Sequence, residues 1–206
     1  MKTASIQGKS PLSLLRASQI RVNEFLVRYE ALGKGEGPKK KQLLRLLRQN
    51  LDIQLELEGG FLYPAIRSAN QASALRFVSD ALRNHEEIKA LLKELTDPDV
   101  ESRSSDLNME ALKQCVLRHF ELERFQIASH LRLLSGEMLR TLSAGMGATR
   151  DRLRSEQVRL GRLPLYPTLQ SETGSPEDDV DTPRSLRAME ELNEGHRSEF
   201  DNWGSE

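Results

Sequence analysis

Two histidines and two glutamates interrupt apolar helical patterns, and they are the residues of this chain best suited to chemistry. His119 and Glu123 lie four residues apart, and the same predicted helix face carries Leu112, Val116, Ile127 and Leu131. Side chains four apart stack on one face of an α-helix. A histidine and a carboxylate are costly in a buried apolar stripe unless each has a partner. The spacing therefore predicts a buried polar site.

Three further apolar stripes are interrupted near their middle in the same way. The interrupting residues are Gln19 in the first stripe, Gln54 and Glu58 in the second, and His85 in the third. If the four segments pack side by side as helices, six polar side chains can meet at one depth. Helical bundles use such layers to hold metal ions.

Two kinds of chemistry fit this layer, and the residues alone leave both open. In the first, Glu58, His85, His119 and Glu123 bind one Fe, Mn or Zn ion, since imidazole and carboxylate suit these metals. In the second there is no metal: protonated His85 and His119 pair with the two glutamates, and the two glutamines donate to the remaining carboxylate oxygens.

Periodic apolar residues predict helices over about residues 11–32, 39–65, 72–95 and 109–134, with Asp106 as the N-cap of the fourth. Gly59, Gly60 and Pro64 predict a kinked turn within the second. A shorter fifth helix is expected to end near residue 157. The sequence therefore predicts an all-α, up-down-up-down four-helix bundle as one domain over residues 10–157.

Composition limits the remaining possibilities. The single cysteine, Cys115, excludes a disulfide within the chain, and no apolar run is long enough to span a membrane, so we expect a cytoplasmic protein. Residues 171–206 carry 11 acidic and 3 basic side chains, which predicts that 158–206 is an acidic, largely disordered tail with a possible short helix. Basic residues near 34–48 and 150–162 lack interleaved aromatic residues, so we interpret them as solvated helix faces and expect no nucleic-acid partner.

Local motifs resemble the hemerythrin-like, HHE cation-binding family over about residues 10–157. The matching stretches are Leu55–Glu58 followed by Phe61–Ile66, Asn84–Leu92 and Leu112–Glu123, with Tyr63-Pro64-Ala65 the most specific. The resemblance implies a four-helix bundle with a non-haem iron pair, bound by histidines from every helix and bridged by two carboxylates. It matches the bridging carboxylates to Glu58 and Glu123, and two histidines to His85 and His119.

The chain departs from the family pattern at Gln19 and Gln54, where the resemblance implies the other two histidines. The residues that remain are the set for a single ion. We therefore expect a reduced site with at most one ion, acting in metal or oxidant sensing or regulation and not in catalysis. The alternatives are a metal-free interaction module, which would engage a protein partner through the acidic tail, and, less favoured, a peroxide-consuming iron enzyme.

Overall fold

The computed structural model describes residues 10–95 and 102–160, and the regular elements of this part of the chain are all helices joined by short turns. The elements in chain order are α1 (Pro11–Glu30), α2 (Gly37–Leu57), the π-helical turn η1 (Glu58–Leu62), α3 (Tyr63–Ser68), α4 (Ala72–Glu94), α5 (Arg103–Leu131) and α6 (Gly136–Arg159). None of these helices is long and apolar enough to cross a membrane.

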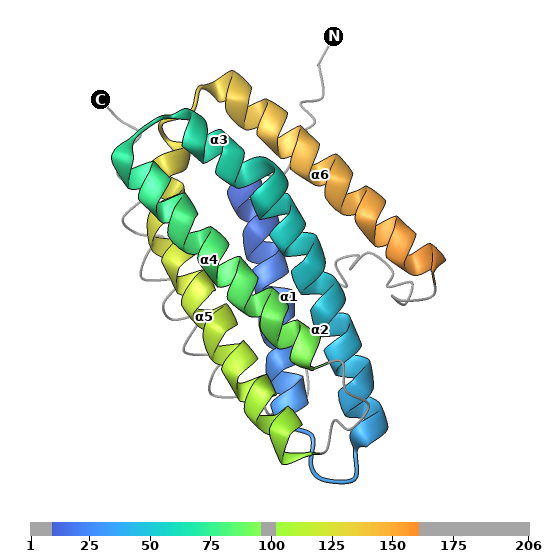
Figure 1. Ribbon diagram of the computed structural model, residues 1–206. Coiled ribbons are helices and arrows are strands. Elements are labelled where there is room, and N and C mark those ends of the chain that lie inside the picture. Colours follow the sequence, from blue (N-terminus) through green and yellow to red (C-terminus); the bar gives the residue numbers. More distant parts are fainter. Residues whose placement is uncertain (1–9, 96–101, 161–206) are drawn as a thin grey trace, which may run out of the picture. The chain divides into compact units, whose positions relative to one another are not determined.

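Four long helices, α1, α2, α4 and α5, run side by side as a bundle, and α3 continues α2 beyond η1 (Figure 1). Helix α6 packs against α1, α2 and η1. The predicted all-α class and four-helix bundle are confirmed. The predicted acidic tail and its possible short helix fall almost entirely on residues 161–206, outside the described residues.

The predicted fifth helix is present as α6, which ends at Arg159, close to the expected residue 157, and its 24 residues make it longer than α1. One detail of the other helices is wrong. The fourth helix starts earlier than expected, because Ser102 and not Asp106 is its N-cap: the Ser102 hydroxyl accepts a hydrogen bond from the backbone N–H of Ser105. A serine at this position satisfies one of the free N–H groups of the first turn.

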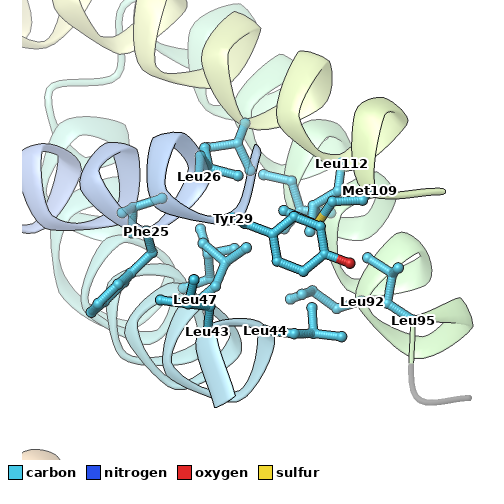
Figure 2. Packing of buried hydrophobic residues seen from close by; sticks show 14 of the residues in the cluster. Phe25, Leu26, Tyr29, Leu43, Leu44, Leu47, Leu92, Leu95, Met109 and Leu112 are labelled. Carbon is cyan, nitrogen blue, oxygen red and sulfur yellow. The ribbon is translucent and has the colours of Figure 1, made fainter. Parts of the chain in front are cut away.

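The apolar core forms two clusters separated by the polar layer. One cluster joins Val22–Tyr29 of α1 to buried residues of α2, α4 and α5 (Figure 2). The other joins Leu14 and Leu15 to α3, to the first half of α4 and to α6. On α1, α4 and α5, the polar residues singled out above lie between the segments that enter the two clusters, whereas on α2 residues of both clusters surround Gln54. The core thus holds the polar layer from both sides.

Helix α4 turns the face that carries His85 inward. Leu75 is 41% exposed, whereas Ala74, Phe77 and Ala81 are buried. At about 100° per residue, Leu75 lies about 80° around the helix from His85, while Ala74 and Ala81 lie within about 40° of it. Two small alanines therefore lie on the inward face next to His85.

Candidate metal centre

Glu58 is the centre of the buried polar layer and is fully buried. Its Oε2 lies 2.9 Å from Nε2 of His85 and 3.2 Å from Nε2 of His119. Its Oε1 accepts a hydrogen bond of 2.7 Å from the side-chain amide of Gln54. One carboxylate from the first residue of η1 thus joins a histidine from α4 to a histidine from α5.

The π-helical turn places a further residue, Tyr63, in this layer. The backbone N–H of Tyr63 donates to the carbonyl of Glu58, five residues earlier. In a regular α-helix two residues five apart point about 140° away from each other, but an i→i+5 bond brings them nearer to one face. The Tyr63 hydroxyl consequently lies 3.2 Å from Nε2 of His85 and 3.5 Å from Oε2 of Glu58.

Glu123 receives hydrogen bonds from two other elements. The Tyr63 hydroxyl donates to its Oε1 at 2.9 Å, and Gln19 of α1 donates to its Oε2 at 2.9 Å. Nε2 of His119 lies 3.7 Å from the same Oε2, which is too long for a hydrogen bond. Glu123 therefore belongs to the layer through tyrosine and glutamine more than through histidine.

Ser18 fixes the orientation of the Gln54 amide. Its hydroxyl donates to Oε1 of Gln54 at 2.9 Å, so the amide NH₂ group faces Glu58. An ionised carboxylate can only accept hydrogen bonds, and this orientation is therefore the one that stabilises Glu58 as an anion. Gln19 does the same for Glu123.

The two buried carboxyl groups have opposite pKa shifts. Burial alone would raise the pKa of Glu58, but the hydrogen bonds from His119 and His85 outweigh it and lower that pKa to about 2. Burial and the nearby charge of Glu58 raise the pKa of Glu123 to about 8. Burial by itself would lower the pKa of His119. The hydrogen bond with Glu58 and the charges of Glu123 and Glu58 outweigh burial, so the pKa of His119 is raised. One buried anion is thus stabilised strongly, and a second negative charge close to it is disfavoured.

Three donor atoms of this layer are close enough to share one metal ion. Ligand atoms of Glu58, His85 and His119 all lie within 4.8 Å of one another, whereas Glu123 is not part of this group. Two ligands of one tetrahedral ion, with bonds of about 2 Å, are separated by about 3.3 Å. The spacings of Glu58 Oε2 from the two Nε2 atoms, 2.9 and 3.2 Å, are near this value. The donor set therefore fits a small divalent transition metal.

The layer contains all six residues singled out in the sequence, namely Gln19, Gln54, Glu58, His85, His119 and Glu123. Sequence reasoning missed Tyr63 and Ser18 as members of it. Tyr63 had been noted only as part of a family-like motif, because α-helical spacing would have turned it away from Glu58. Ser18 carried no signal of its own, although it immediately precedes Gln19.

A sequence model of the Hemerythrin HHE cation binding domain matches residues 10–131. Among solved structures, the chain is similar to a hemerythrin HHE cation binding domain-containing protein from Mycobacterium kansasii, with 16% sequence identity and a TM-score of 0.62. That similarity covers 75% of this chain and 93% of the other, and it supports the fold. A comparison with curated proteins gives no match. Because the sequence match spans more than half of the chain and includes every residue of the polar layer, the protein belongs to the hemerythrin HHE cation-binding domain family.

Proposed function

We propose that the bundle binds one transition-metal ion through Glu58, His85, His119 and Glu123. The observation that carries this proposal is that Nε2 of both histidines faces the same carboxylate oxygen of Glu58. The ion would replace the protons that these groups now share, as metals commonly do at histidine and carboxylate ligands. Glu123 would supply the fourth ligand after a small rotation of its side chain.

The ligand types favour Fe, Mn or Zn, since two carboxylates balance a divalent charge and imidazole suits all three metals. Gln19 and Gln54 donate their amide groups to the two carboxylates, so their role is to orient the ligands. Outer partners of this kind hold metal ligands in position and tune the affinity.

A single ion, with glutamine amides that only orient its two carboxylate ligands, supports a role in metal or oxidant sensing or regulation more than catalysis. Dioxygen carriage by an iron pair would need a second set of histidines, and glutamines stand at those two positions. We assign the role to the bundle domain at 10–157 and to the cytoplasm, where the lone buried Cys115 would remain reduced.

Elemental analysis of protein purified from cells supplied with iron, manganese and zinc tests the proposal. We expect close to one ion per chain for the wild type and a loss of most of it in Glu58→Gln and His119→Ala. Glu56→Gln and Glu121→Gln are matched controls, because both side chains are exposed on the same two helices. These controls should retain the metal. A wild-type metal content near zero would overturn the proposal.

A second candidate is a metal-free interaction module, and it is favoured by the hydrogen bonds that both buried carboxylates already receive. The donors are tyrosine, histidine or glutamine side chains. The bundle would then serve as a scaffold, and the acidic residues 171–206 would engage a basic surface of a protein partner. This candidate predicts the same melting temperature with chelator and with added iron, and a loss of partner binding when residues 171–206 are deleted.

A further inference from the structure

A cavity of about 370 Å³ opens at the end of the bundle where the α1–α2 loop meets the first turns of α5. Its walls include the buried apolar residues Leu26 and Met109, which lie on either side of Tyr29 (Figure 2). It shares no residue with the candidate metal centre. Met109 and His119 are ten residues apart on α5, which corresponds to about 15 Å along the helix.

The Tyr29 hydroxyl is a buried polar group without a hydrogen-bond partner among the described residues. Tyr29 is only 4% exposed. Burial raises the pKa of its phenol, and the nearby Ser105 hydroxyl, which lowers that pKa, does not reverse the effect. The phenol therefore stays protonated and can donate a hydrogen bond. Buried polar groups normally have partners, so an unsatisfied hydroxyl beside a cavity points to a ligand.

Lys40 brings a second donor to the same cavity. It is 7% exposed, and its Nζ lies 5.7 Å from the centre of the Tyr29 ring. Its nearest carboxylate oxygen is Oδ1 of Asp106 at 3.8 Å, beyond hydrogen-bond distance. The sequence had suggested that Lys40 belongs to a solvated helix face, and the structure shows it buried instead. Asp106 thus balances the charge of Lys40 at ion-pair distance but accepts no hydrogen bond from it, and buried N–H groups without an acceptor are costly.

The other acidic residues of the cavity already have partners. Glu30 pairs with Lys113, and Glu110 accepts a hydrogen bond from Gln114. Lys34 adds an exposed positive charge at the rim. The donors that remain available therefore suit an anion.

We propose that this cavity binds a small amphipathic carboxylate. The carboxylate would contact Nζ of Lys40 and the Tyr29 hydroxyl, and the apolar chain would lie along Leu26, Leu32 and Met109. One water needs only about 10–15 Å³ on the same measure, so a volume of about 370 Å³ exceeds the needs of a carboxylate group alone. It falls at the lower end of the range for small-molecule pockets.

Calorimetric titration of the full chain with octanoate tests this proposal, with octanamide and inorganic phosphate as comparison probes. We expect saturable octanoate binding, at least tenfold weaker binding of octanamide, which lacks the charge, and no binding of phosphate, which lacks the apolar chain. Phosphate binding as tight as octanoate binding would overturn the proposal, as would the absence of saturable octanoate binding at millimolar concentrations.

Variants locate the bound octanoate within the cavity. Lys40→Met should weaken binding at least tenfold, and Leu32→Trp should abolish it by filling the space while leaving the charges in place. Lys39→Met is the matched control, since Lys39 is exposed and pairs with Glu36, and it should bind like the wild type. His119→Ala should also bind octanoate normally, which separates this cavity from the metal centre. Unchanged affinity in both Lys40→Met and Leu32→Trp would contradict the assignment.

Discussion

Tyr63 lies between two buried carboxyl groups whose negative charges would repel each other. Its hydroxyl donates to Glu123 and lies 3.5 Å from the nearest oxygen of Glu58. Burial, followed by the charges of both glutamates, strongly raises the pKa of this phenol, so it remains a donor. The residue thus holds Glu123 in place with or without a metal ion.

Replacing Tyr63 with phenylalanine tests this role. Without its donor, Glu123 loses a buried hydrogen bond, and we expect Tyr63→Phe to lower the free energy of unfolding by about 1–3 kcal/mol in chelator-treated protein. Tyr29→Phe is the matched control, because the hydroxyl removed there makes no hydrogen bond within the described part of the chain, and its effect should stay within about 0.5 kcal/mol. Chemical denaturation measures both values. Equal losses in the two variants would contradict the account.

His130 supplies a pH-dependent contribution to stability outside the metal centre. It is 5% exposed and stacks on Phe77 at 5.3 Å, and its burial lowers its pKa. In the unfolded chain, His130 binds a proton near pH 6.5, whereas in the folded chain it does so only at lower pH. Stability is therefore lost as the pH falls below about 6.5 toward the folded pKa.

His130→Phe keeps a ring against Phe77 and removes the titrating group. We expect the free energy of unfolding to fall less between pH 8 and pH 5 in this variant than in the wild type. Urea denaturation across that pH range provides the measurement. Parallel pH profiles for the two proteins would show that His130 does not contribute this dependence.

At the level of single residues, the sequence predicted which polar side chains enter the core but not all of their partners. His119 and Glu123 were identifiable because their α-helical neighbours are apolar. The burial of Lys40 was not predictable, since a lysine among other basic residues normally lies on a solvated face. Its burial depends on Tyr29 and Asp106 from other helices.

Among the elements, the π-helical turn and α6 are coupled through Phe61. A Cβ atom built on Gly145 of α6 would lie 2.9 Å from Cε1 of Phe61, which is closer than side chains normally approach. A Cβ atom built on Gly147, two residues later, would have no neighbouring atom within 4 Å. The glycine at 145 therefore allows α6 to approach the turn that positions Glu58 and Tyr63.

This contact gives a matched pair of substitutions. Gly147→Ala should stabilise the protein by about 0.5–1 kcal/mol, because alanine favours the helix. Gly145→Ala gains the same preference but displaces the Phe61 ring, and we expect it to be less stable than Gly147→Ala by about 1 kcal/mol or more. Thermal unfolding compares the two variants. Combining Gly145→Ala with Phe61→Ala should abolish the difference, and a difference that persists would point to another cause.

Helix positions were predictable from apolar periodicity, and the kinked turn from Gly59 and Gly60. The start of α5 was not, because Ser102 and Asp106 are both acceptable caps by residue type, and the choice depends on which hydroxyl or carboxylate reaches a free N–H group. The end of α6 was predicted to within two residues, although only Leu142 and Met146 of this helix are buried and its apolar pattern is weak.

For the whole molecule, the candidate metal centre takes its side chains from all four helices of the bundle. Ligand binding to the folded state alone stabilises a protein, by about 2.7 kcal/mol at a hundredfold excess over the dissociation constant. We therefore expect iron or zinc to raise the melting temperature of the wild type and chelator to reverse the rise. His119→Ala should show no rise. An equal rise in this variant would mean that the metal binds elsewhere.

Anomalous diffraction from crystals grown with iron or zinc would show whether one metal ion binds in the polar layer. We expect one anomalous peak per chain, within coordinating distance of Glu58 and of Nε2 of both His85 and His119. Glu123 should then have turned toward the ion. A map without a peak at this position, with both histidines still hydrogen-bonded to Glu58, would contradict the proposed metal site.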